Sequence, residues 1–165
     1  MIKEIIIILI LFTIITIPLI SLIRRGYFDN RTFYKLIEKD GLPYISLKIG
    51  KRKCLFLIDT GTQKSIIDTK LATECKCNIE TLNTEKKLYI ALPTTNIKHM
   101  ISQKTVCNIN LNHLYKQQFE FLCVDNLEID GILGLDWIKA NKVHILPNRK
   151  RITFPNNLIN KSKKR

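Results

Sequence analysis

Residues 55–65 read LFLIDTGTQKS, and the interpretation of the whole chain depends on this stretch. Four apolar residues lead directly into Asp59, and Thr60 and Gly61 follow it. A carboxylate at the end of a buried strand is costly unless its charge or its proton is shared with another group. The stretch therefore indicates either a hydrogen-bonded structural turn or a reactive site.

Short strands dominate the pattern around this stretch. Apolar and polar residues alternate, or apolar residues follow one another over a few positions, as is typical of β-strands. The expected strands are 44–50, 54–58, 87–92, 99–103, 105–114, 118–124, 143–146 and 151–154. One helical window, DWIKANK at 136–142, follows the run DGILG. The pattern predicts an all-β domain with one short helix over residues 42–155.

The chain of 165 residues is strongly basic, with 27 Lys and Arg against 14 Asp and Glu and a net charge of +13. Its 45% hydrophobic content is typical of a folded domain rather than a disordered tail. The basic residues are scattered, and no zinc-finger or RNA-binding signature accompanies them. The basic tail at 156–165 could contact nucleic acid or anionic lipid, but we interpret the charge mainly as solvated surface.

Five cysteines form an odd set without a repeating spacing: Cys54, Cys75, Cys77, Cys107 and Cys123. This set favours reduced thiols over a disulfide framework. Cys75 and Cys77 are too close in sequence for a CxxC pair, and the three histidines lie far from them. The GxGxxG spacing of a phosphate-binding loop is missing. We therefore expect neither a metal site nor a cofactor.

The start of the chain differs from the rest. After a short segment at 1–4, residues 5–23 carry no charged side chain. As a helix they would extend about 28 Å, close to the ~30 Å hydrocarbon core of a bilayer. The alternatives are a cleaved signal peptide and a buried core helix. We favour a retained transmembrane anchor, because no small-residue cleavage motif follows the apolar run.

Charges near the apolar run predict its orientation. Lys3 is offset by Glu4 before it, whereas several Lys and Arg follow it in a polar linker at 24–41. The positive-inside rule then places the C-terminal domain in the cytosol of a single-pass membrane protein. Glycosylation sequons at Asn30 and Asn160 point weakly to the opposite topology.

Two segments together resemble one known family. LFLIDTGTQKSII, beginning at Leu55, resembles the active-site strand and loop of the retropepsins, the aspartic proteases of retroviruses and LTR retrotransposons. GILGLDWIKANKVHILPNRKRITF, beginning at Gly131, is similar to the ILGLDWL segment of retroelement proteases and the hairpin after it. The resemblance covers residues 42–155 and implies a closed β-barrel equivalent to half of the pepsin fold.

The resemblance also implies a reaction. Aspartic proteases hydrolyse peptide bonds with two carboxylates that share a proton, because like charges so close together cannot both ionise. Only one Asp-Thr-Gly occurs here, so a homodimer would supply Asp59 from each copy. The implied function is a membrane-anchored aspartic endopeptidase acting on a polypeptide, such as a viral or retroelement polyprotein.

Roles for the active-site loop follow from the same resemblance. Thr60 would interlock with its mate in the second chain beneath the two carboxylates. Gly61 would allow its carbonyl to reach the substrate backbone, and Thr62 would complete the loop. Ile132, Leu133 and Gly134 would pack under the loop. Asp136 would cap the helix and brace the loop.

A flap hairpin that closes over the substrate is also implied. Its candidate tip is formed by Leu92, Pro93, Thr94, Thr95 and Asn96. This tip departs from the family pattern, because flap tips often carry glycine and no glycine occurs between Gly61 and Gly131.

Two interpretations from other classes remain open. The domain could be a catalytically silent dimerisation module that keeps Asp-Thr-Gly for the interlock alone. The chain could also be a membrane-anchored basic scaffold that holds nucleic acid or lipid through its tail. Cleavage that depends on Asp59 distinguishes the protease from both.

Overall fold

The computed structural model describes residues 16–17, 31–82, 88–92, 95–111 and 115–155. The chain divides into two compact units, Met1–Asn30 and Arg31–Arg165. In the first unit only Thr16 and Ile17 are described, and both are helical. The rest of the expected anchor at 5–23, both sequons and the tail at 156–165 lie outside the described residues. Among the described residues, no helix combines the length and the apolar character needed to cross a membrane.

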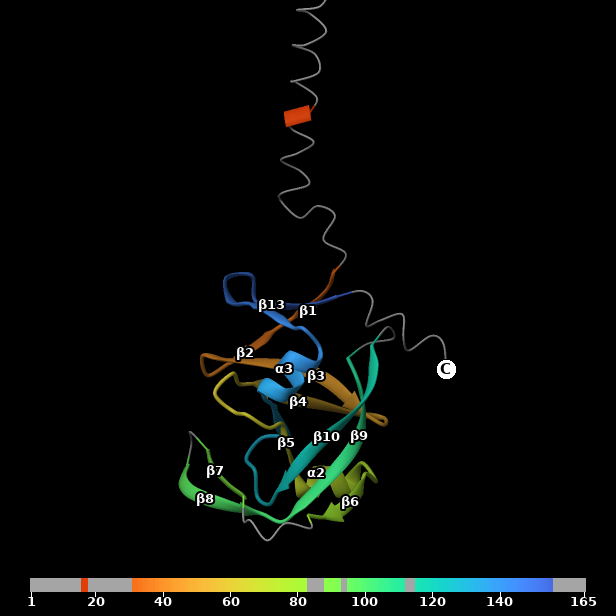
Figure 1. The fold of residues 1–165 in the computed structure, drawn as a ribbon, viewed down its shortest axis with the longest axis vertical. Coiled ribbons are helices and arrows are strands. Elements are labelled where there is room, and N and C mark those ends of the chain that lie inside the picture. The colour runs from red at the N-terminus through yellow and green to blue at the C-terminus, as the bar shows by residue number, and fades with distance from the viewer. Residues whose placement is uncertain (1–15, 18–30, 83–87, 93–94, 112–114, 156–165) are drawn as a thin grey trace, which may run out of the picture. The chain divides into compact units, whose positions relative to one another are not determined.

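The second unit consists mainly of strands (Figure 1). The strands are β1 (Arg31–Lys35), β2 (Ile37–Lys39), β3 (Leu42–Ile49), β4 (Arg52–Ile58), β5 (Ile66–Asp68), β6 (Asn78–Thr81), β7 (Leu88–Leu92), β8 (Thr95–Ile101), β9 (Gln103–Asn110), β10 (Lys116–Val124), β11 (Gly131–Leu133), β12 (His144–Leu146) and β13 (Arg151–Pro155). The helical elements are α2 (Thr69–Glu74), α3 (Leu135–Ala140) and the 3-10 turn η1 (Pro147–Arg149). The predicted all-β class is therefore confirmed.

A closed barrel forms the body of the domain. Strands β3, β4, β11, β5, β10 and β9 are hydrogen-bonded in that order, and β9 pairs back with β3. The closing contact is short, with Lys48 opposite Asn110 and Ile49 opposite Ile109. Closure removes the free edges that an open sheet of these strands would expose. The expectation of a closed barrel agrees with this topology.

Residues 31–39, expected to lie in a polar linker, form strands instead. β1 pairs along its whole length with β13, which also pairs with β12 to make a separate three-stranded sheet. β2 forms a hairpin with β3, and Leu36 between β1 and β2 is buried. The linker was predicted from its charge, whereas pairing with a strand from the far end of the domain determines its structure.

The structure contains a helix, α2, that the sequence pattern did not predict. Asp68 is its N-cap, and the Asp68 carboxylate accepts a hydrogen bond of 2.9 Å from the Leu71 amide. Leu71 and Ala72 bury its inner face. Six residues are too few for a helical period to be recognised, so the expectation of one short helix was wrong. The helix that was expected, α3, is present but begins at Leu135.

The main core is formed by side chains of the barrel strands together with residues of α2, α3 and β13. Trp137 is fully buried and meets Phe154 edge to face, with ring centroids 5.6 Å apart. At the end of β4, Phe56, Leu57 and Ile58 are all buried, because Phe56 and Ile58 pack into the main core and Leu57 packs into a second core cluster on the opposite face of the strand. This packing fixes the position at which β4 ends, directly before Asp59.

Candidate active site

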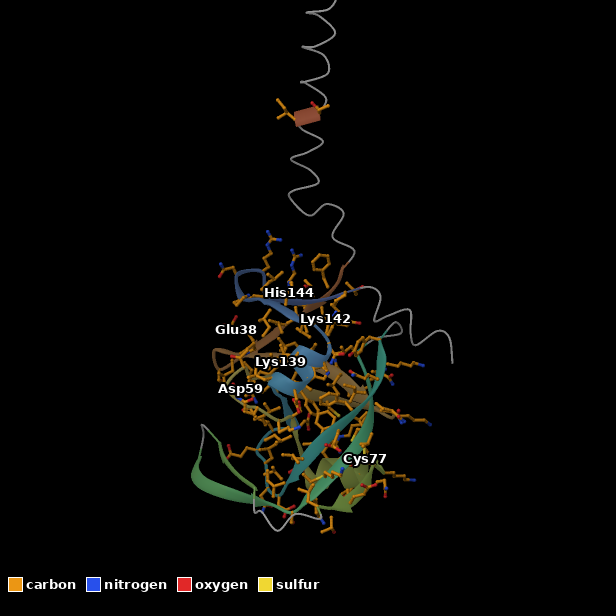
Figure 2. The ribbon with its side chains drawn as sticks, viewed as in Figure 1. Glu38, Asp59, Cys77, Lys139, Lys142 and His144 are labelled. Atoms are coloured by element: carbon orange, nitrogen blue, oxygen red, sulfur yellow. The ribbon has the colours of Figure 1, made fainter. Side chains whose placement is uncertain are left out.

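Asp59 is the first residue after β4, and its backbone is held by the neighbouring strand. The Asp59 amide donates to the Leu133 carbonyl at 3.1 Å, which extends the parallel pairing of β4 with β11 by one step. The residue is partly exposed, in contrast to the buried residues before it. The buried strand therefore ends at a fixed point, and the Asp59 carboxylate lies at the surface there (Figure 2).

Both oxygens of the Asp59 carboxylate accept hydrogen bonds from the loop that follows. The Gly61 amide donates to Oδ1 at 2.8 Å, and the Thr62 hydroxyl donates to Oδ2 at 2.6 Å. A Cβ atom on Gly61 would lie 3.2 Å from Oδ1, so glycine allows this close approach. Within the described residues, these two donors are the hydrogen-bond partners of the side chain, and together they orient the carboxylate plane.

The start of α3 holds the far side of this loop. The Leu135 amide donates to the Thr62 carbonyl at 2.8 Å, and the Asp136 amide donates to the Gln63 carbonyl at 3.2 Å. The first amides of a helix lack partners within the helix, and here the loop carbonyls supply them. The loop and the helix therefore satisfy each other's backbone groups.

Asp136 braces the loop but is not the helix cap. The N-cap position is Gly134, which makes no side-chain capping bond. The Asp136 carboxylate instead receives the Ser65 amide at 3.0 Å and the Ser65 hydroxyl at 2.6 Å, and it also accepts from the Trp137 amide at 2.7 Å. The predicted helix cap is therefore wrong, since the N-cap lies two residues before Asp136, whereas the expected contact of Asp136 with the loop is present.

Ser65 is a site residue that the sequence analysis did not identify. It is 1% exposed, and its hydroxyl also accepts a hydrogen bond of 3.0 Å from the Gly134 amide. A Cβ atom on Gly134 would lie 2.7 Å from the Thr62 carbonyl oxygen, so the backbones approach too closely for a side chain. No local pattern marks Ser65, because its partners lie far along the chain.

The remaining predicted supporting residues fall into two groups. Ile132 and Leu133 are buried in β11, and Ile132 pairs with Leu57 on one side and Ile66 on the other. Thr60 is exposed beside Asp59, and its expected contact is with a second chain. The single chain thus places a buried β11 next to the strand that ends at Asp59.

The expected flap region contains an antiparallel hairpin. β7 pairs with β8 from Leu88 opposite Ile101 to Leu92 opposite Thr95, with an irregularity between Ala91 and Leu92. Pro93 and Thr94 lie outside the described residues, and Asn96 is in β8. The hairpin and Asp59 lie on the same side of the domain in the view of Figures 1 and 2.

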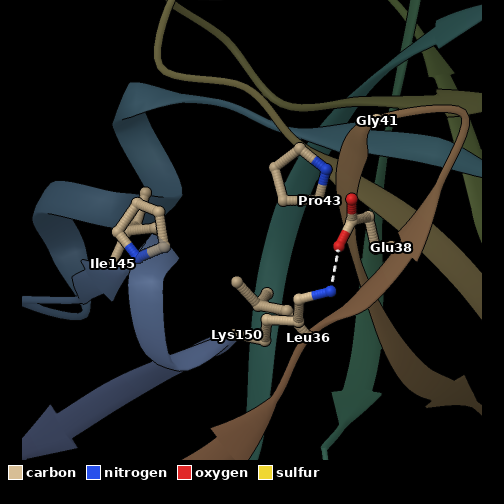
Figure 3. A pocket seen from close by; sticks show the side chains of 7 residues that line it. Leu36, Glu38, Gly41, Pro43, Ile145 and Lys150 are labelled. Atoms are coloured by element: carbon tan, nitrogen blue, oxygen red, sulfur yellow. Dashed lines mark ion pairs between the residues drawn. The ribbon is translucent and has the colours of Figure 1, made fainter.

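A separate hollow lies between the β2–β3 hairpin and the chain after α3 (Figure 3). Leu36, Pro43 and Ile145 are among the residues that line it, and an ion pair of 2.6 Å joins Lys150 to Glu38. Lys150 lowers the pKa of Glu38 through a hydrogen bond and its charge. The lining contains no Ser, Thr, Cys or His, and Asp59 is not part of it.

Across the described ranges, no cluster of three or more His, Cys, Asp or Glu side chains is placed to hold a metal ion. The chemistry that the site can perform with its own residues is carboxylate chemistry at Asp59. A carboxylate held by an amide and a hydroxyl can accept a proton from water when a second acid is present to polarise the substrate.

Comparison with protein families identifies the class of domain. A family model described as retroviral aspartyl protease matches residues 46–159, which is more than half of the chain. The chain belongs to this family, and its folded part is a retropepsin-like aspartic protease domain. A search of curated protein sequences found no significant match.

Three solved structures illustrate the likeness of fold. The retroviral protease-like domain of Ddi1 from Leishmania major is 19% identical, with a TM-score of 0.54 over 70% of this chain and 89% of that one. A retropepsin-like aspartic protease from Rickettsia conorii is 17% identical, with a TM-score of 0.50 over 75% and 90%. The EIAV protease complexed with the inhibitor HBY-793 is 14% identical, with a TM-score of 0.51 over 67% and 97%. At these identities the comparison shows the fold.

Proposed function

We propose that the chain is an active aspartic endopeptidase that works as a symmetric homodimer. The observation that carries this proposal is the state of Asp59: its carboxylate is oriented by Gly61 and Thr62, yet no described carboxylate of the same chain hydrogen-bonds to it. An aspartic protease needs two carboxylates, so a second copy supplies the other. Each chain is then half of an active site on a two-fold axis.

The reaction follows from one proton shared by two Asp59 side chains. The ionised carboxylate takes a proton from a water molecule, and the water oxygen attacks the scissile carbonyl carbon. The protonated carboxylate donates its proton to the carbonyl oxygen, which gives a tetrahedral intermediate. Transfer of a proton to the amide nitrogen then allows the C–N bond to break.

A polypeptide in extended conformation is the substrate that we propose. The β7–β8 hairpin is a candidate flap, and its strands offer backbone groups to an extended chain. Membership of a retroviral protease family supports polyprotein processing as the biological role. The EIAV protease, which shares this fold, was solved as a complex with an inhibitor.

We also propose that residues 5–23 anchor the chain in a membrane, with the domain in the cytosol. The apolar run and the basic residues after it support this proposal. Confinement to a membrane would raise the effective concentration of the two halves of the dimer. Protease protection on sealed vesicles tests the topology. Protection of the domain from protease in intact vesicles, or a glycan on Asn30, would indicate the opposite topology.

The decisive experiment compares Asp59→Asn with wild type in the full chain, using a peptide library and mass spectrometry of the products. Asn preserves the size of the side chain, so folding and dimerisation should survive while hydrolysis falls by several orders of magnitude. Asp125→Asn is the matched control, because Asp125 is exposed in the turn after β10. Hydrolysis by Asp59→Asn at the wild-type rate would overturn the proposal.

Wild-type chains that form dimers but do not cleave any peptide would instead support the dimerisation module. Binding of nucleic acid or anionic vesicles that survives Asp59→Asn and is lost on deletion of residues 148–165 would support the basic scaffold. Sedimentation of the same preparations measures the oligomeric state. A fully active monomer would refute the half-site argument.

A further inference from the structure

Two cysteine sulfurs lie close together at a site remote from Asp59. The Cys77 and Cys107 sulfurs are 2.8 Å apart, although the residues are 30 positions apart in sequence. Cys77 directly precedes β6, and Cys107 lies in the middle of β9. In Figure 2, Cys77 lies beside α2 and β6, away from Asp59. All five cysteines are free thiols in this structure.

The backbone already has the geometry that a disulfide needs. β6 and β9 are antiparallel, with Asn78 opposite Val106 and Ile79 opposite Thr105. Continuing this register by one residue places Cys77 opposite Cys107. Opposed residues of antiparallel strands have Cα atoms about 4.5–5.5 Å apart, which is within the range that a disulfide bridges. Joining the two sulfurs therefore needs side-chain rotation and little backbone movement.

The strand register favours Cys107 over the other cysteines as the partner of Cys77. Cys75 forms its side-chain hydrogen bond with Cys54, on β4. Lys76, between the two cysteines, has a left-handed backbone with φ of 56°, and this turn directs Cys75 and Cys77 to different strands. Cys123 is buried in β10, where it lies opposite Gln103 of β9, whereas Cys107 lies opposite Phe119.

Exposure assigns different roles to the two thiols. Cys77 is partly exposed, so an oxidant can reach it from solvent. Cys107 is 1% exposed, and burial raises the pKa of its thiol, so it remains protonated and protected in the reduced domain. The exposed thiol is therefore the one to react first, and the buried thiol is held ready to resolve the product.

We propose that Cys77 and Cys107 form a reversible intramolecular disulfide when the chain meets a disulfide oxidant such as glutathione disulfide. The Cys77 thiolate attacks one sulfur of the oxidant, which forms a mixed disulfide and releases one glutathione. Cys107 loses its proton to solvent and attacks the Cys77 sulfur, which releases the second glutathione. The protein dithiol is oxidised by two electrons, and one glutathione disulfide is reduced to two thiols.

The position of the bond gives it a consequence for the flap candidate. Residues 77–107 would become a closed loop that contains β6, β7 and β8. At the base of this loop, the Leu82 amide already donates to the Ser102 carbonyl at 2.8 Å. A covalent link in addition to this hydrogen bond restricts the conformations of the loop. Oxidation should therefore reduce the motion of the β7–β8 hairpin.

The test uses the full chain in buffers of increasing glutathione disulfide to glutathione ratio. Free thiols are then alkylated, and unreduced peptides are mapped by mass spectrometry. We expect wild type to lose two alkylatable thiols and to yield a peptide that links Cys77 to Cys107. Asp59→Asn should form the same link, which separates this inference from the proposed proteolysis.

Variants and a second measurement complete the design. Cys77→Ser and Cys107→Ser should abolish the linked peptide, whereas Cys123→Ser should keep it. Backbone hydrogen exchange in residues 88–92 and 95–101 should slow in the oxidised wild type and remain unchanged in Cys77→Ser. The proposal is overturned if wild type keeps both thiols alkylatable under oxidation, if Cys77 is linked to Cys75 instead, or if exchange in the crosslinked chain is unchanged.

Discussion

The Ser65 hydroxyl donates a hydrogen bond of 2.6 Å to Asp136 Oδ1, although the two residues are 71 positions apart. This bond joins the loop after Asp59 to the first turn of α3. The same hydroxyl accepts from the Gly134 amide, so one buried oxygen serves two partners. The position of the candidate catalytic loop therefore depends on a residue that takes no part in the proposed chemistry.

Ser65→Ala should destabilise the domain by about 1–3 kcal/mol, because it leaves the Gly134 amide without its partner and removes one donor from the Asp136 carboxylate. Urea unfolding followed by fluorescence of Trp137, the one tryptophan of the chain, measures the change. Ser102→Ala is the control, since the Ser102 side chain is exposed. Equal unfolding midpoints for the two variants would contradict the role of Ser65.

Thr62→Val should lower kcat/KM roughly 10- to 100-fold, the effect of losing a hydrogen bond to a charged group. Val keeps the branched shape but cannot donate to Asp59 Oδ2, so the carboxylate loses one of its two constraints. Peptide hydrolysis under saturating and subsaturating substrate gives kcat and KM. Thr81→Val, at an exposed position of β6, should leave both unchanged. A Thr62→Val enzyme with wild-type kcat/KM would show that the hydroxyl is dispensable.

Trp137→Phe should be tolerated better than Trp137→Ala. The indole is fully buried, and within the described residues its nitrogen has no hydrogen-bond partner. Phe keeps the edge-to-face contact with Phe154 and removes this unpaired donor, whereas Ala leaves a cavity that costs about 3–5 kcal/mol. Urea unfolding followed by circular dichroism compares the two. If Phe is as destabilising as Ala, packing around the ring is not what Trp137 contributes.

Alkaline pH should destabilise the domain through its buried thiols. Burial is the main cause that raises the pKa of Cys54 from 9.0 to about 12 and that of Cys123 from 9.0 to about 11. Above pH 9.0 the unfolded chain releases these protons and the folded chain keeps them, so stability is complete below that value. It is lost progressively as the pH rises towards about 11 for Cys123 and about 12 for Cys54.

The measurement is urea unfolding in reducing buffer over this pH range. The double variant Cys54→Ala, Cys123→Ala should lose stability less steeply with pH than wild type, although its stability at neutral pH is lower. Identical slopes for the two proteins would mean that the thiols do not cause the alkaline loss.

The sequence predicted those parts of the site that depend on local pattern. The apolar run before Asp59 requires a buried strand, and the glycine after it permits a close turn, so the position of the carboxylate followed from adjacent residues. The contact of Ser65 with Asp136 could not be predicted in this way. It depends on the pairing of β11 with β4 and β5, which involves residues that are distant along the chain.

The same distinction explains the differences in the fold. The residues of β1 were interpreted as a charged linker, because they form a strand only by pairing with β13, which lies at the other end of the domain. α2 has only a capping aspartate and two buried residues to mark it. Barrel closure between β3 and β9 rests on two residue pairs, which no local period can reveal. Family resemblance, rather than periodicity, supplied the expectation of closure.

The insertion of β11 between β4 and β5 affects when the site can form during protein synthesis. Leu133 holds the Asp59 amide, and Asp130 accepts from the Leu55 amide at 2.7 Å across 75 positions. During synthesis Asp59 leaves the ribosome early, but both contacts are missing until nearly the whole domain has been made. Folding that waits for such distant contacts is slow. The nascent chain therefore carries its acidic residue without a formed loop, and the site is assembled only after β11 has been synthesised.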